Sequence, residues 1–220
     1  MAKTQKIEED KVPLSEEQFD KIMKEGAEKD ASDSKTQLAL KGLEFFVNFE
    51  TRTIYLEDEI DIFTPAFIKR RVESICQITK DTESPVNIEI CTYGGDAYAM
   101  LALVDLIRTC PVKINTIARG PVMSAGAFVL AAGTGVRFAY PNSQIMLHDI
   151  FGMVKGSSRD VIVESDHWKK LQDRCYTILS EFTGKPKSFW KRKFKTTLYL
   201  SAKEALKYNL IDEVVNKWKI

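Results

Sequence analysis

The sequence predicts an α/β fold, and three observations support this prediction. Short apolar runs rich in Val and Ile, typical of buried strands, recur between residues 86 and 148. Glycine or proline follows these runs and favours turns. Two of the runs precede apolar segments long enough for helices. Strands that alternate with helices indicate crossover connections within one sheet.

The first elements follow in chain order. Residues 43–60 contain two β-rich runs around a polar Asn-Phe-Glu-Thr stretch, which predicts a hairpin. Residues 65–79 begin with proline and carry apolar side chains at helical spacing, which predicts a helix. Next come a strand over 86–91, a turn at Gly94-Gly95 and a helix over 97–110. The pattern then repeats as a strand over 112–118, a turn over 119–123 and a helix over 124–133.

The second half begins with strands over 136–140 and 144–148 around a Pro-Asn-Ser turn. A long amphipathic helix over 160–182 should end at Gly184, which suits a helix C-cap. A helix over 201–209 and an apolar run over 210–215 close the chain. Between them, the basic aromatic stretch 185–195 could be a nucleic-acid patch. We favour a helix with Phe189, Trp190 and Phe194 packed inward and solvated lysines.

Composition narrows the class of protein. Of the 220 residues, 44% are hydrophobic, which suffices for one well-packed domain. The 32 Lys and Arg nearly balance the 31 Asp and Glu, so the net charge of +1 gives no reason to expect nucleic acid or an anionic membrane as partner. No apolar run could span a membrane or act as a secretory signal, which predicts a cytoplasmic protein.

The remaining compositional signals are modest. The four cysteines are widely spaced, which predicts reduced thiols. Two histidines are too few for a histidine-rich metal site, and we expect neither metal nor cofactor. Residues 1–40 form a charged arm with a helical piece at Leu14–Glu28, partly disordered or docked on a partner, and residues 41–220 form the folded domain.

Ser124 is the candidate nucleophile. A serine hydroxyl needs a base that takes its proton and donors that stabilise the resulting oxyanion. Ser124 follows a strand and its turn and opens a helix, where unpaired N–H groups face developing negative charge. The Gly94-Gly95 turn offers a further N–H without an obstructing side chain. His148, directly after another strand, is the candidate base.

Simpler interpretations exist for each residue. Serine at a helix start is usually an N-cap, a histidine at a strand end is usually structural, and His167 on the long helix is interpreted as structural. The Gly-x-Ser-x-Gly elbow of α/β-hydrolases is absent, because Val122 stands at its first glycine. The hypothesis of a catalytic serine therefore depends on Ser124, His148 and the glycine turn occurring together.

Four segments in this order resemble the proteolytic subunit of the Clp protease family: GGDAYAMLALVDLIRT (94–109), GPVMSAGAFVLAAG (120–133), RFAYPNSQIMLH (137–148) and SAKEALKYNLID (201–212). The spacing matches from about Arg52 to Val215. The resemblance implies the fold shared by Clp protease and crotonase, a repeated β-β-α superhelix with a long handle helix, here preceded by the N-terminal arm.

The resemblance also implies residue roles. Ser124 would be the nucleophile and His148 the general base, with the backbone N–H groups of Gly95 and Ala125 as the oxyanion hole. Phe151, Gly152, Met153 and Val154 would hold unfolded polypeptide substrates as an added strand. The long helix would join two heptameric rings into a tetradecamer, a chamber that receives substrate from an ATP-dependent unfoldase or contains related subunits.

The chain departs from the family at the third triad position, where an acid is usual and Lys193 stands here. An acid orients the histidine and stabilises the imidazolium. Three substitutes are open: the hydroxyl of Thr196 or Thr197, a carboxylate such as Asp166 or Asp173, or neutral Lys193 itself as base. Asp149 is not counted, because neighbouring strand residues face opposite sides.

A second departure concerns the partner and leaves alternatives open. Asn87 and Glu89 replace aromatics that usually line the unfoldase-docking pockets, while Phe138 and Tyr140 keep part of the apolar lining. Because the third triad position is not acidic, the chain could be an active peptidase subunit or a silent scaffold subunit of the same architecture. A crotonase-type acyl-CoA enzyme is the third possibility, and the paired Ser124 and His148 argue against it.

Overall fold

The computed structural model describes residues 34–42 and 45–215, so the predicted helix at Leu14–Glu28 lies outside the described residues. The chain divides into two units, residues 1–41 and 42–220. Within the first unit, the described residues 34–41 are helical. The account below concerns the second unit.

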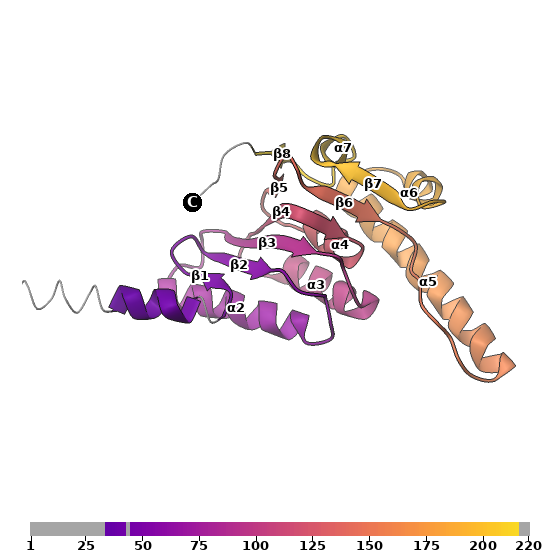
Figure 1. Cartoon of the computed structure of the whole chain (residues 1–220), viewed down its shortest axis with the longest axis horizontal. Helices are drawn as coiled ribbons and strands as arrows, with labels where there is room; N and C mark the ends of the chain where they lie inside the picture. Colours follow the sequence, from indigo (N-terminus) through magenta and orange to yellow (C-terminus); the bar gives the residue numbers. More distant parts are fainter. Residues whose placement is uncertain (1–33, 43–44, 216–220) are drawn as a thin grey trace, which may run out of the picture. The chain divides into compact units, whose positions relative to one another are not determined.

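The second unit is built on one mixed sheet with helices packed against it, as the alternation in the sequence predicts (Figure 1). Its main path runs β1-β2-β3-β4-β5-β8, and β6 pairs with both β4 and β7. The strands are β1 (Val47–Asn48), β2 (Thr53–Leu56), β3 (Val86–Thr92), β4 (Ile114–Met123), β5 (Arg137–Ala139), β6 (Gln144–Leu147), β7 (Leu198–Ser201) and β8 (Glu213–Val214). All pairs are parallel except β1–β2 and β6–β7.

The helices bury their apolar faces against this sheet and against one another. They are α2 (Thr64–Thr79), α3 (Ala97–Thr109), α4 (Ala125–Ala131), α5 (Ser158–Thr183), α6 (Lys187–Lys193) and α7 (Ala202–Lys207). Neighbours α2, α3 and α4 pack side by side, and α2 and α3 lie along one side of the strands (Figure 1). Every residue of α4 is buried, which explains its small and apolar composition.

Helix α5 has the length and the C-terminal cap that the sequence predicts. A capping box between Ser157 and Asp160 opens it, and Gly184 ends it in a left-handed conformation. Its buried residues all lie in its C-terminal half, beginning at Leu171. The first turns project away from the sheet (Figure 1), with Val161, Ile162 and Val163 exposed.

The basic aromatic stretch folds as a helix with its aromatic residues directed inward. Trp190 and Phe194 are buried, while Phe189 is half-buried and packs edge-on against Trp190. The Trp190 indole N–H donates to Thr183 Oγ1 at 3.1 Å. The packed-helix interpretation therefore describes this segment correctly.

One predicted element is wrong. Residues 119–123, expected as a turn, belong to β4, which continues to Met123. The β3–β4 register shifts here: Ile90 pairs with Ala118 but Thr92 pairs with Val122, so β4 bulges over residues 119–121. Gly120, at φ +67°, accommodates the bulge. The bulge lets β4 leave β5 and pair with β6 from Pro121 onward.

Candidate active site

Three neighbouring parallel strands deliver the candidate residues to one edge of the sheet. The strands β3, β4 and β6 are adjacent, and Met123 of β4 is level with Met146 of β6. Ser124 therefore follows the end of β4 beside the point where His148 follows β6. The Gly94-Gly95 turn follows β3 at the same edge, which is where sites form in parallel sheets.

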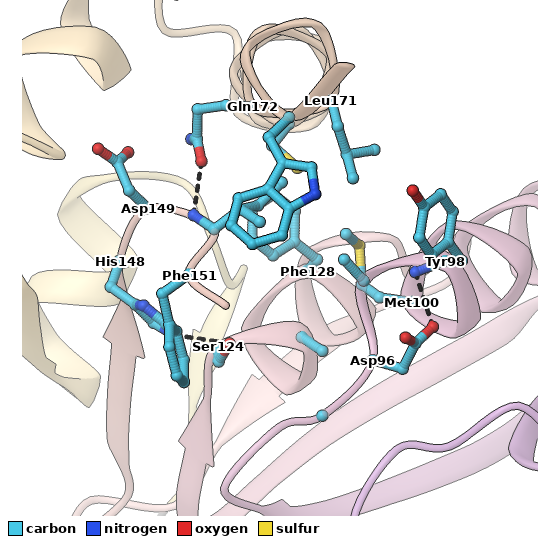
Figure 2. Close-up of a pocket in the computed structure, with 16 residues that line it drawn as sticks. Asp96, Tyr98, Met100, Ser124, Phe128, His148, Asp149, Phe151, Leu171 and Gln172 are labelled. Atoms are coloured by element: carbon cyan, nitrogen blue, oxygen red, sulfur yellow. Dashed lines mark hydrogen bonds between the residues drawn. The ribbon is translucent and has the colours of Figure 1, made fainter. Parts of the chain in front are cut away.

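Ser124 and His148 are hydrogen-bonded, with 2.8 Å between Ser124 Oγ and His148 Nε2 (Figure 2). Ser124 occupies the N-cap position of α4, but its side chain makes no capping hydrogen bond. Its backbone is strained, at φ 52° and ψ −121°, and its N–H donates to Met146 O at 2.8 Å. The cap interpretation thus fails, because the hydroxyl bonds to the histidine and not to the helix N-terminus.

The Gly94-Gly95 turn lies directly beside Ser124. A Cβ added to Gly94 would come within 2.7 Å of Ser124 Cβ. Two backbone hydrogen bonds fix the turn to Ile60: the Ile60 N–H donates to Gly94 O at 2.8 Å, and the Asp96 N–H donates to Ile60 O at 2.7 Å. The turn therefore presents its backbone at a defined place beside the hydroxyl.

Two amides at this place are unused. In residues 34–42 and 45–215, neither the Gly95 N–H nor the Ala125 N–H donates to a backbone or side-chain acceptor. Both residues line the same hollow as Ser124 and His148. Free backbone donors beside a serine–histidine pair are the arrangement that stabilises a tetrahedral oxyanion.

The hollow has a volume of about 210 Å³ and lies between the strand edge, α3 and α5. Part of its wall is apolar and comes from three helices: Met100 of α3, Phe128 of α4, and Leu171 and Cys175 of α5. Burial raises the pKa of the Cys175 thiol to about 11, so the thiol stays protonated. It acts as a small apolar surface there.

The segment expected to hold substrate borders the hollow. Phe151 and Met153 are exposed at 81% and 91%, and the Phe151 ring lies 5.2 Å from the His148 ring. In the described chain, residues 151–155 make no backbone hydrogen bond. Gly152 lies under the Trp168 indole, where an added Cβ would come within 2.6 Å of the ring.

No carboxylate reaches the His148 ring within the described residues; its partners are the Ser124 hydroxyl and the Phe151 ring. The Lys193 ammonium lies over the Phe189 and Tyr208 rings, 5.7 and 5.1 Å from their centroids, and does not line the hollow. Neither Thr196 nor Thr197 bonds to the histidine.

The candidate carboxylates are engaged elsewhere. Asp166 pairs with Lys169 at 2.9 Å, and Asp173 pairs with Lys187 and Lys191. Hydrogen bonds from these lysines lower the pKa of both carboxyls. Asp149 accepts from the Tyr176 hydroxyl at 2.8 Å. The carboxylates considered as substitutes for the triad acid are therefore bound to other groups.

The polar residues Asn87 and Glu89, already noted in the sequence, lie at alternate positions of β3 in the sheet. Asn87, Glu89, Phe138 and Tyr140 line a second hollow of about 320 Å³. Glu89 is buried and pairs with Arg119, whose guanidinium lies 4.6 Å from the centroid of the Tyr140 ring. This hollow therefore combines the ion pair of the buried Glu89 with aromatic and other apolar side chains.

Sequence reasoning missed one residue of the site. Trp168 lies against Gly152, and no short-range pattern links the two. His167, interpreted as structural, meets the Tyr98 hydroxyl at 2.9 Å.

Residues 45–218 match the family model described as Clp protease, which covers more than half of the chain. Across the described residues, no helix is both long and apolar enough to cross a bilayer.

Proposed function

The chain belongs to the Clp protease family, and from this premise we propose that it is a serine endopeptidase in which Ser124 is the nucleophile and His148 the general base. The observation that carries the proposal is the 2.8 Å hydrogen bond between Ser124 Oγ and His148 Nε2 beside the two unused amides of Gly95 and Ala125.

The geometry supports a two-step acyl transfer. Ser124 Oγ attacks the scissile carbonyl carbon while its proton passes to His148 Nε2. The carbonyl oxygen becomes an oxyanion that accepts hydrogen bonds from the Gly95 and Ala125 N–H groups. His148 then gives the proton to the leaving amine. In the second step, His148 takes a proton from water, the water oxygen attacks the acyl carbon, and His148 returns the proton to Ser124 Oγ as the acid product leaves.

We assign substrate binding to Phe151, Gly152, Met153 and Val154. Their open backbone groups suit the addition of an extended peptide as a strand. A site that binds backbone reads few side chains, so unfolded polypeptides of varied sequence are the expected substrates. The apolar wall beside Ser124 favours an apolar residue before the cleaved bond.

Assembly into two stacked rings is also part of the proposal. The exposed Val161, Ile162 and Val163 on the projecting half of α5 offer apolar surface for contact between rings. The hollow around Glu89 and Arg119 contains an ion pair whose carboxylate is buried, so we expect an ATP-dependent unfoldase that inserts an apolar anchor to dock weakly there.

A second candidate is a silent subunit that builds or regulates a ring. The favouring observation is that no described carboxylate contacts His148. From the resemblance of the sequence, we place Lys193 at the position where the family usually has its acid. Loss of the acid costs about 10⁴ in turnover in serine proteases. The active and silent subunits differ in whether Ser124 reacts at all.

Labelling with a fluorophosphonate discriminates between them. For the active peptidase we expect one added mass per chain, located at Ser124, which disappears in Ser124→Ala and falls strongly in His148→Ala. His167→Ala, which removes the other histidine, is the matched control and should label normally. Absence of labelling in the wild-type chain at every pH from 6 to 9 would reject the peptidase in favour of the silent subunit.

A further inference from the structure

We infer that Tyr176 and Gln172 are positioning residues, which hold the segment His148–Ile150 so that His148 Nε2 stays on the Ser124 hydroxyl. The inference rests on the proposed peptidase function. It assigns to α5 the orienting task that an acid performs in a complete triad.

The sheet fixes His148 from one side only. Strand β6 pairs with β4 and β7, and the last paired residue is Leu147, opposite Leu198. His148 is thus the first residue beyond the sheet. On its other side, Phe151 and Met153 are exposed and the backbone of 151–155 is unpaired.

Two hydrogen bonds with side chains of α5 hold the other side of the segment. The Ile150 N–H donates to Gln172 Oε1 at 2.7 Å, and the Tyr176 hydroxyl donates to Asp149 Oδ1 at 2.8 Å. Figure 2 shows the Gln172 side chain reaching from α5 to the chain between Asp149 and Phe151. The two residues directly after the histidine are therefore each tied to the helix.

The anchor itself is rigid. Gln172 and Tyr176 are four residues apart and share one face of α5. They alternate with Leu171 and Cys175, which are buried. The Tyr176 ring packs edge-on against Phe194, with 5.3 Å between centroids. Because buried side chains hold this part of α5, its hydrogen bonds transmit a fixed position to the histidine segment.

The donor keeps its proton over the working range. Burial, and then the hydrogen bond to Asp149, raise the pKa of Tyr176 to about 12. The hydroxyl therefore donates to the Asp149 carboxylate at any pH at which a histidine could act as base.

Removing one oxygen tests the inference. In Tyr176→Phe we expect the rate constant of Ser124 labelling by the fluorophosphonate, and kcat for a short fluorogenic peptide, to fall about tenfold with KM unchanged, as for a lost hydrogen bond to a charged group. The final labelling stoichiometry should stay at one per chain. Tyr199→Phe removes an exposed hydroxyl from β7 and is the matched control.

A second pair of variants separates a positioning role from a folding defect. Gln172→Glu keeps an oxygen for the Ile150 N–H and should retain most of the rate, whereas Gln172→Leu should lose it. A purely structural role would lower the labelled fraction or the melting temperature while the rate constant of the labelled chains stayed the same. That result, or Tyr176→Phe within twofold of wild type, would overturn the inference. A wild-type chain that does not label would instead reject the proposed function itself.

Discussion

Replacing Gly95 by alanine tests whether its amide belongs to the reaction centre. Gly95 has φ +150°, and an alanine Cβ would lie 2.0 Å from the Ile60 carbonyl oxygen. The methyl group therefore cannot be accommodated unless the turn moves off Ile60. That movement would break the hydrogen bonds between Ile60 and the turn and withdraw the Gly95 N–H from the hollow.

The structure allows the cost to be estimated. An alanine in a positive-φ conformation costs about 1–2 kcal/mol, and each of the two lost backbone hydrogen bonds costs about 0.5–1.5 kcal/mol. The total of roughly 2–5 kcal/mol stays below the unfolding free energy of most domains of this size. Loss of one oxyanion donor lowers kcat by about 10²–10³. We therefore expect a folded but nearly inactive protein.

Gly184→Ala is the matched control. Gly184 also has positive φ, at +67°, but no atom lies within 4 Å of an added Cβ, and it caps α5 away from the hollow. Gly184→Ala should therefore lower the stability of the protein without lowering kcat. Thermal unfolding and peptide-cleavage kinetics of the two variants separate the effects. If folded Gly95→Ala cleaved peptides with a kcat within threefold of Gly184→Ala, the oxyanion role of Gly95 would be refuted.

Two further predictions concern the substrate-binding segment 151–154 and the ion pair between Arg137 and Asp212. Gly152→Ala would bring a methyl group within 2.6 Å of the Trp168 ring, and overpacking of this kind costs about 1–3 kcal/mol. We expect KM for peptides to rise about tenfold in this variant and to recover in Gly152→Ala/Trp168→Leu. An unchanged KM would contradict the role of residues 151–154 in substrate binding. Arg137 holds Asp212 in three hydrogen bonds, two from its guanidinium and one from its backbone N–H, which lower the pKa of that carboxyl. Because the folded-state pKa is depressed, the stabilisation is present above the ordinary pKa near 4 and is lost as pH falls through the lower folded value. Urea unfolding should therefore find Asp212→Asn less stable than wild type by about 1 kcal/mol at pH 7, after allowance for solvent screening, and equal to it near pH 2; an equal difference at both pH values would exclude the ion pair as the cause.

Much of this arrangement could be predicted from short stretches of sequence. The Val- and Ile-rich runs, the C-terminal cap of α5 and the positions of Ser124 and His148 near strand ends are properties of neighbouring residues. The bulge in β4 was missed because Arg-Gly-Pro is typical of a turn, and only pairing with both β3 and β6 keeps these residues in a strand. Local propensity is overridden there by hydrogen bonds to distant chain segments.

By itself, the sequence determined the α/β class, the order of elements, a serine that opens a helix after a strand and turn, and a histidine that directly follows a strand, because periodicity and turn chemistry act over a few residues. The tertiary structure alone decided which side chains meet. Register between β4 and β6 brings the serine to the histidine, and the packing of α5 binds Asp149 to Tyr176 rather than to the imidazole. These contacts join residues more than twenty positions apart, and their geometry follows from how the whole domain packs, which no local pattern encodes.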